Sequence, residues 1–237
     1  IEIIQNQMTR NNIDLWYGTA SFVDPHRVRI EREADHVEHT ADFIVIACGT
    51  VPARPAHIPF DDQTIIDTDG LLALKDLPKS ITIIGGGVIG AEYASILATM
   101  GIHVTLIERR PRLLEFVDQE TIEALQYHMR SIGVILRFNE EVVSVEPVAE
   151  QQVIVRLKSG KEIAASTVLY SVGRTGASAT LNLAAIGLTA DDRGRLSVNE
   201  HYQTSVPHIY AAGDIIGFPA LASTSMQQGR HAACHAF

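Results

Sequence analysis

The stretch ITIIGGGVIG (Ile81–Gly90) decides how this chain folds. It begins as a short, largely apolar strand and continues as G-x-G-x-x-G, with glycines at positions 85, 87 and 90. Helix-forming sequence follows at Ala91–Ala98, and then a second apolar strand, His103–Ile107, that ends in Glu108. Strand, loop, helix, strand and terminal acid occur in the order that binds a dinucleotide. The alternative is a glycine-rich turn in an ordinary βαβ unit.

Each part of this pattern has a physical role. Gly85 lets the chain turn off the strand, Gly87 lets a diphosphate approach the backbone, and Gly90 lets the helix pack closely on the strand. The unpaired N–H groups at the start of the helix favour anionic phosphates. Glu108, about 18 residues after the last glycine, is placed to accept hydrogen bonds from an adenosine ribose. The loop residues expected to bind the cofactor are Gly85, Gly86, Gly87, Val88, Ile89 and Gly90.

Composition limits the class of protein. The chain has 237 residues, of which 46% are hydrophobic, so it can bury a large core and form two domains. No apolar stretch is long enough to cross a bilayer, and a net charge of −9 argues against nucleic acid or an anionic membrane as a partner. We expect a soluble, cytoplasmic protein without a metal site, in which Cys48 and Cys234 are small buried hydrophobic residues.

Further elements follow from local patterns. Residues 1–10 predict the end of a helix, and the runs Ile13–Tyr17, Arg27–Ile30 and Phe43–Ala47 predict strands. The nearly continuous apolar run from Asp42 to Thr50 is typical of a strand buried on both faces.

The middle of the chain predicts a second helix and a set of strands. The helix is capped by Asp118 and ended by Gly133. Lys158–Lys161 predicts a hairpin turn. The expected strands lie near Val134–Arg137, Glu141–Val145, Val153–Leu157 and Thr167–Tyr170.

Four strings together resemble one family: DFIVIACGTVP (Asp42–Pro52), TIIGGGVIGAEYA (Thr82–Ala94), SVGRT (Ser171–Thr175) and TSVPHIYAAGD (Thr204–Asp214). The chain is similar to the flavoprotein disulfide reductases, which have two dinucleotide-binding domains. The resemblance implies an α/β fold with a complete, Rossmann-like NAD(P) domain at residues 78–172. Residues 1–77 and 173–237 would be parts of an incomplete FAD domain.

The same resemblance shows what the sequence lacks. The N-terminal FAD fingerprint of the family, its redox C-x-x-x-x-C and its C-terminal dimerisation domain are not found. We therefore expect an internal fragment. The intact enzyme is expected to be a homo-oligomer, and the fragment a monomer.

Roles in the site are carried over from the family residue by residue. Asp214 would bind the ribitol of FAD, although it could instead cap a helix after a buried strand. Glu92 would lie near the nicotinamide and the flavin, the one candidate catalytic residue; its alternative is a carboxylate in the first turn of a helix. Gly173 would contact the nicotinamide end through its backbone, or serve only as a turn glycine.

The choice of nicotinamide nucleotide is open. Glu108 alone predicts NAD, because its negative charge would repel the 2′-phosphate of NADP. For two unit charges about 4 Å apart, this repulsion costs roughly 4 kcal/mol at an effective dielectric constant near 20. The loop Arg109–Arg112 follows directly, and guanidinium groups suit phosphate. We hypothesise that Glu108 serves the free 2′-hydroxyl while Arg109 or Arg110 moves in for the phosphate. The alternative is a solvated loop that pairs with Glu115 or Asp118.

Within the family, FVDQE (Phe116–Glu120), GRTG (Gly173–Gly176) and DIIGFPALAS (Asp214–Ser223) are most similar to the transhydrogenases. The implied activity is transfer of hydride between NADH and NADP through FAD, so the expected cofactors are FAD, NAD and NADP. A disulfide reductase similar to lipoamide dehydrogenase is the alternative within the family. A nucleotide-binding module without catalysis is the alternative outside it.

Overall fold

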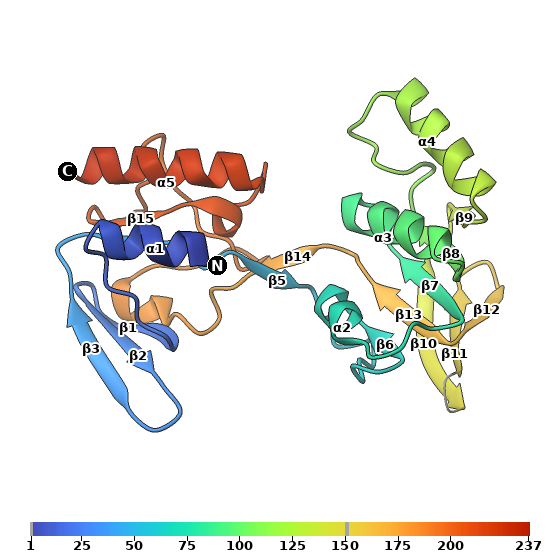
Figure 1. Ribbon diagram of the computed structural model, residues 1–237, viewed down its shortest axis with the longest axis horizontal. Coiled ribbons are helices and arrows are strands. Elements are labelled where there is room, and N and C mark those ends of the chain that lie inside the picture. Colours follow the sequence, from blue (N-terminus) through green and yellow to red (C-terminus); the bar gives the residue numbers. More distant parts are fainter. Residues whose placement is uncertain (1, 150–151) are drawn as a thin grey trace. The chain divides into compact units, whose positions relative to one another are not determined.

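The computed structural model describes residues 2–149 and 152–237 and divides into two compact units. The first unit combines Ile1–Val51 with Thr175–Phe237, and the second is the continuous segment Pro52–Arg174. This compact unit contains the predicted NAD(P) domain, residues 78–172, together with the segment from Pro52 to residue 77. Figure 1 shows the blue and red ends of the chain in the first unit and the green and yellow middle in the second.

A five-stranded parallel sheet forms the centre of the second unit. In spatial order its strands are β6 (Ile65–Ile66), β13 (Thr167–Tyr170), β7 (Ser80–Ile84), β8 (His103–Glu108) and β9 (Ile135–Phe138). Helix α3 (Val88–Thr99) connects β7 to β8, and α4 (Gln119–Ser131) connects β8 to β9. Parallel strands joined by helices are the expected α/β arrangement, which is confirmed.

The two faces of this sheet bury different partners, as the alternation of side chains in a strand requires. Ile83 of β7 and Leu106 of β8 lie in the core formed with α3 and α4. Ile84 and Ile107, the next residues along each strand, lie in a second core on the other face.

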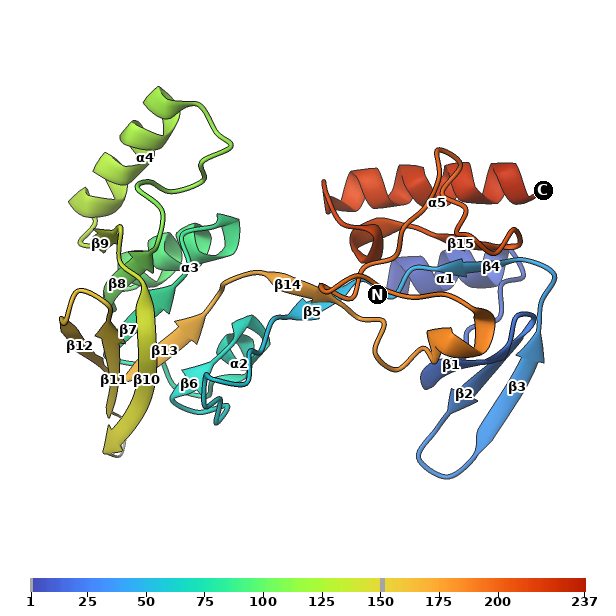
Figure 2. The ribbon, with the colours of Figure 1, turned by 180° about the vertical axis from the view of Figure 1, so that it is seen from behind.

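An antiparallel meander covers that other face. It consists of β10 (Val142–Ala149), β11 (Gln152–Leu157) and β12 (Glu162–Ala165), and it is seen from the opposite side in Figure 2. Gly160, with φ +83°, lies in the expected turn between β11 and β12. The sheet is therefore enclosed on both faces, while its carboxyl edge carries the glycine loop.

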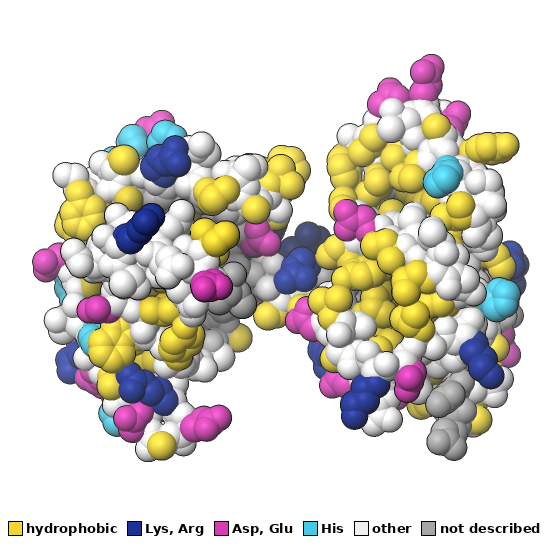
Figure 3. Space-filling view, viewed as in Figure 1, with side chains coloured by type: hydrophobic (Ala, Val, Ile, Leu, Met, Phe, Trp, Pro, Cys, Tyr) yellow, Lys and Arg dark blue, Asp and Glu magenta, His cyan; other side chains and the backbone are white. Residues whose placement is uncertain are grey.

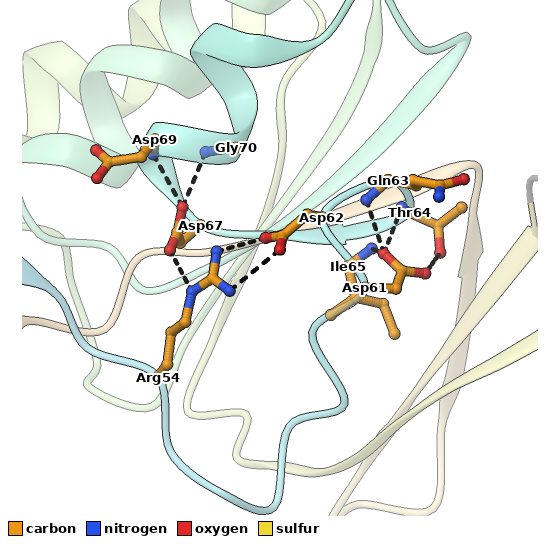
Figure 4. A network of polar contacts seen from close by, with 9 residues as sticks. All are labelled: Arg54, Asp61, Asp62, Gln63, Thr64, Ile65, Asp67, Asp69 and Gly70. Atoms are coloured by element: carbon orange, nitrogen blue, oxygen red, sulfur yellow. Dashed lines mark hydrogen bonds and ion pairs between the residues drawn. The ribbon is translucent and has the colours of Figure 1, made fainter. Parts of the chain in front are cut away.

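Side-chain caps begin two helices of this unit. Asp118 caps α4, as predicted, by accepting hydrogen bonds from the amides of Glu120 and Thr121. Asp67 caps α2 (Thr68–Ala73) in the same way and also accepts a 2.6 Å hydrogen bond from Arg54 Nε. Arg54 reaches Asp62 with its other nitrogens, so one guanidinium ties the chain entering the unit to α2 (Figure 4).

The first unit holds two small sheets and a long helix. Strands β1 (Thr19–Asp24), β2 (Arg27–Glu31) and β3 (His36–Thr40) are antiparallel. Strands β4 (Ile44–Ile46) and β15 (Ile209–Ala211) are parallel and contact α5 (Ala222–Ala236). The remaining helical segments are α1 (Glu2–Arg10), η1 (Leu183–Ile186) and η2 (Gly213–Ile216). Segments β5 (Thr50–Pro52) and β14 (Arg174–Gly176) pair where the chain passes between the units.

Three expectations for the first unit are wrong. Residues 13–17 form no strand, because no segment in the described part of the chain pairs with them. The run from Asp42 gives only three strand residues. Val45 is 43% exposed while Ile46 is buried, because successive side chains point to opposite faces and only the face that carries Ile46 packs in the core of this unit. Cys48 and Cys234 are free and exposed rather than buried, because one follows the end of β4 and the other lies on an outer face of α5. The helix expected at residues 1–10 is confirmed from Glu2 onward, while Ile1 lies outside the described residues.

Among the described residues, no helix combines the length and the apolar character needed to span a bilayer.

We predict that Leu106→Ala lowers the free energy of unfolding by about 2–5 kcal/mol, because the side chain is fully buried between the sheet and its helices. Ile135→Ala, on a side chain that is 53% exposed, is the matched control and should cost far less. Urea unfolding followed by circular dichroism measures both. Equal losses in the two variants would contradict this assignment of the core.

Candidate nucleotide-binding site

The glycine loop between β7 and α3 is shaped by close backbone contacts. Gly85 has φ +109°, and a β-carbon there would lie 2.9 Å from the carbonyl oxygen of Ser171. A β-carbon on Gly90 would lie 1.9 Å from the carbonyl oxygen of Gly85, so only glycine lets the helix approach the strand end. At Gly87, in contrast, nothing lies within 4 Å of the added carbon. The loop is tightly packed on its inner side and open at the start of the helix.

The start of α3 is suited to an anion. Gly87 is the N-cap and provides no side-chain hydrogen bond to the first amides of the helix. The first turn contains no acidic residue, so no side chain within that turn offsets the positive end of the helix dipole. Val88, Ile96 and Met100 on or beside this helix are about half exposed, and Figure 3 shows hydrophobic side chains gathered over this part of the second unit. An anion at this position would meet backbone amides rather than charged side chains of α3.

Ser171 directly follows β13 and holds the start of the glycine loop by hydrogen bonds. Its hydroxyl donates to the carbonyl oxygens of Ile84 at 2.9 Å and Gly85 at 3.3 Å, and its amide also donates to Ile84. The sequence patterns do not identify this residue as part of the site. The available signal was a hydroxyl residue at the carboxyl end of a strand that neighbours β7 in a parallel sheet.

Glu108 lies at the end of β8 with only 6% of its surface exposed. Its Oε2 accepts hydrogen bonds from the Gly86 amide at 2.6 Å and from Arg110 Nη2 at 3.1 Å. Its Oε1 accepts from the Arg110 amide at 2.9 Å and from Arg110 Nε at 3.0 Å. The carboxylate therefore connects the glycine loop to the arginine loop.

The ionisation of Glu108 reflects this environment. Burial pushes the pKa of its carboxyl upward, but the Arg110 guanidinium and the amides of Arg110 and Gly86 outweigh burial and lower the pKa below its ordinary value. Glu108 is thus a carboxylate at neutral pH.

Acidic residues hold part of the arginine loop, residues 109–112. The alternative that this loop pairs with Glu115 or Asp118 applies to Glu115. Besides Glu108, Arg110 has Glu115 at 4.0 Å, and Arg112 donates to the Glu115 carbonyl oxygen. Asp118 instead caps α4. Arg109 is exposed and forms no hydrogen bond or ion pair in the part of the chain that the structure describes.

Two further candidate residues belong to the second unit. Glu92 is the fifth residue of α3 and is exposed, so the alternative that it is a first-turn carboxylate is wrong. Gly173 follows β13, has φ +90° and is exposed, and its carbonyl oxygen accepts a hydrogen bond from the Ala53 amide.

Asp214 belongs to the first unit, just after the carboxyl end of β15. Its carboxylate accepts a hydrogen bond from the Thr50 hydroxyl at 3.4 Å, and Thr50 itself follows β4. The N-cap of η2 is Ala212, so the alternative that Asp214 caps a helix is wrong. The arrangement places a half-buried carboxylate at the ends of two parallel strands, where ligands of open α/β sheets bind.

Comparison with known proteins identifies the family. The family model of the pyridine nucleotide-disulphide oxidoreductases matches residues 2–229, and the chain belongs to this family. The curated soluble pyridine nucleotide transhydrogenase of Mycobacterium bovis is 48% identical over 239 residues, covering 100% of this chain and 51% of the relative. The corresponding protein of Klebsiella pneumoniae is 48% identical, covering 94% of this chain and 48% of the relative. The chain spans about half the length of the curated relatives it matches.

Solved structures agree on the fold. LpdA from Mycobacterium tuberculosis superposes with a TM-score of 0.91 at 27% identity, covering 99% of this chain and 52% of that one. A copper(II) complex of a cysteine-to-serine mutant of the flavoprotein disulfide reductase RclA from Escherichia coli superposes with a TM-score of 0.89 at 28% identity, covering 99% of this chain and 54% of that one. The expected resemblance to the flavoprotein disulfide reductases is thereby confirmed.

We predict that Glu108→Gln lowers the free energy of unfolding by about 1–3 kcal/mol at pH 7, because the buried hydrogen bonds lose their charged acceptor. The lowered pKa of Glu108 means that its charge stabilises the fold above the unfolded-state pKa of about 4.3. This contribution is lost as pH falls through the folded-state value, so the gap between wild type and variant should close below about pH 4.

Unfolding in urea at pH 7, 5 and 3.5 measures this gap. Glu123→Gln, on the exposed side of α4, is the matched control and should show a small difference at every pH. A gap for Glu108→Gln that does not change with pH would contradict the assigned role of the charge.

Proposed function

We propose that this chain binds a nicotinamide dinucleotide at the loop between β7 and α3. The observation that carries the proposal is the open, uncapped start of α3 at Gly87, next to a loop that Ser171 and Glu108 hold in place. In this proposal the amides of residues 87–90, at the start of α3, hold the diphosphate, and Glu108 receives the adenosine ribose. Arg109 and Arg110 are the candidates for a 2′-phosphate.

For the whole protein we propose transfer of hydride between NADH and NADP. The relatives at 47–48% identity carry the name soluble pyridine nucleotide transhydrogenase, and their match extends over nearly all of this chain. FAD, when bound, supplies the centre that accepts and returns the hydride. We also propose the cytoplasm as the location of the protein and a homo-oligomer as its intact state.

The residues of the first unit fit a flavin-binding role. Asp214 offers a half-buried carboxylate beside the Thr50 hydroxyl, and such an acceptor suits the hydroxyl groups of a ribitol chain. We propose that Asp214 orients FAD through these hydrogen bonds. In the second unit, Glu92 and the backbone of Gly173 are proposed to position the nicotinamide end.

A disulfide reductase similar to lipoamide dehydrogenase remains the second candidate. It is favoured by the structural likeness to LpdA and RclA, although both are only 27–28% identical to this chain. The higher identity of the transhydrogenases favours the first candidate. A binding module without catalysis is the third, and co-purification of flavin with this chain would argue against it.

We predict that Gly87→Asp weakens NAD binding at least about tenfold without loss of stability. Gly87 has φ −75° and open space around its α-carbon, so the backbone accepts a side chain there. An aspartate at the N-cap stabilises a helix, but its charge opposes the diphosphate at the same amides.

Calorimetric titration with NAD and NADP, together with thermal unfolding, tests this prediction. Gly87→Ser is the matched control, since it supplies a neutral cap of similar size. Unchanged affinity of Gly87→Asp for both nucleotides would place their binding elsewhere and refute the proposed site.

A further inference from the structure

The hydrogen-bonding capacity of Glu108 is fully used by the protein itself. A carboxylate offers about four acceptor positions, two on each oxygen. Among the described residues, Gly86 fills one of these and Arg110 fills three. A ribose hydroxyl that binds to Glu108 must therefore displace one of these donors.

The donors differ in how readily they leave. The Gly86 amide is buried, and losing its 2.6 Å hydrogen bond would leave an unsatisfied N–H group, which is costly. The Arg110 amide is fixed by the loop backbone, because the Arg110 carbonyl oxygen accepts from Asn139. The Arg110 side chain is 42% exposed, so its guanidinium can be rehydrated when it moves. A ribose hydroxyl can therefore displace the side chain of Arg110 from Glu108 more readily than either backbone amide.

We propose that Arg110 is a specificity-determining residue that competes with the ribose hydroxyls of NAD for Glu108 and favours a 2′-phosphate in their place. The inference rests on the proposed nucleotide site. With NAD, the Nε and Nη2 groups of Arg110 must release the carboxylate before a hydroxyl can bind. With NADP, they can remain in place.

The geometry of Arg110 allows it to stay on Glu108 while a 2′-phosphate binds. Nε and Nη2 donate to Glu108, whereas Nη1 lies 4.0 Å from Glu115, beyond hydrogen-bond distance, so Nη1 retains capacity for a phosphate oxygen. The paired guanidinium also neutralises the carboxylate that would repel the phosphate. One residue thus offsets the preference for NAD that Glu108 alone would impose.

Arg109 provides the contrast. It is exposed and makes no contact with Glu108 through its side chain within the described residues. Its loss would remove a positive charge near the phosphate without freeing any acceptor on Glu108. Arg109→Ala is therefore expected to weaken NADP modestly and to leave NAD unchanged.

Calorimetric titration of the chain with NAD, NADP, AMP and 2′,5′-ADP tests the proposal, the last two isolating the adenosine end. We expect Arg110→Ala to bind NAD and AMP about two- to fivefold more tightly. In this variant the ribose hydroxyls no longer have to displace the Arg110 guanidinium from Glu108, and a partly exposed ion pair of this kind contributes little free energy. The same variant should bind NADP and 2′,5′-ADP at least about tenfold more weakly. Arg110→Met, which keeps most of the side-chain length, should behave alike.

Arg130→Ala, which removes an exposed charge from α4, is the control for net charge and should change none of these affinities. NAD binding that is equal or weaker in both Arg110 variants, with wild type still binding NAD, would overturn the proposal alone. Wild type that binds neither NAD nor NADP would overturn the proposed function and this inference with it.

Discussion

The hydrogen bond from the Gly86 amide to the Glu108 carboxylate is the contact on which the rest of the site depends. It joins the end of β8 to the loop after β7, and both groups are buried. A buried carboxylate is tolerated only when its acceptor positions are satisfied, and Arg110 together with Gly86 satisfies them. The position of the glycine loop, the ionisation of Glu108 and the course of the arginine loop therefore have one common cause.

The two-sided enclosure of the parallel sheet explains why the site lies at its edge. With helices on one face and the β10–β12 meander on the other, the backbone groups at the carboxyl ends of β7 and β8 are where a ligand can reach the sheet. Ser171 extends this edge by one strand, because β13 pairs with β7 in parallel register. In the first unit, too, polar side chains lie beyond the carboxyl ends of parallel strands: Thr50 comes after β4 and Asp214 after β15.

Local signals predicted much of this from sequence. The strand, loop and helix around the spaced glycines, the Asp118 cap and the hairpin turn at Gly160 each depend on only a few neighbouring residues, and each of these structures was confirmed. What failed or was missed depends on distant partners. Whether the segment at residue 13 or the strand at Val45 is covered depends on pairing that no local pattern reveals. The donors that saturate Glu108, and the hydroxyl of Ser171, come from chain segments brought together only by the sheet.

The central claim is that the amides at the start of α3 hold the diphosphate of a nicotinamide nucleotide. Backbone amide chemical shifts of the ¹⁵N-labelled chain, followed during titration with NAD, test it most directly. We predict that the largest changes fall on Gly87, Val88 and Ile89, whose amides lie at the start of α3, and that ADP reproduces them, because both ligands carry the diphosphate. Saturating NAD that leaves these amides unchanged while shifting others would contradict the account.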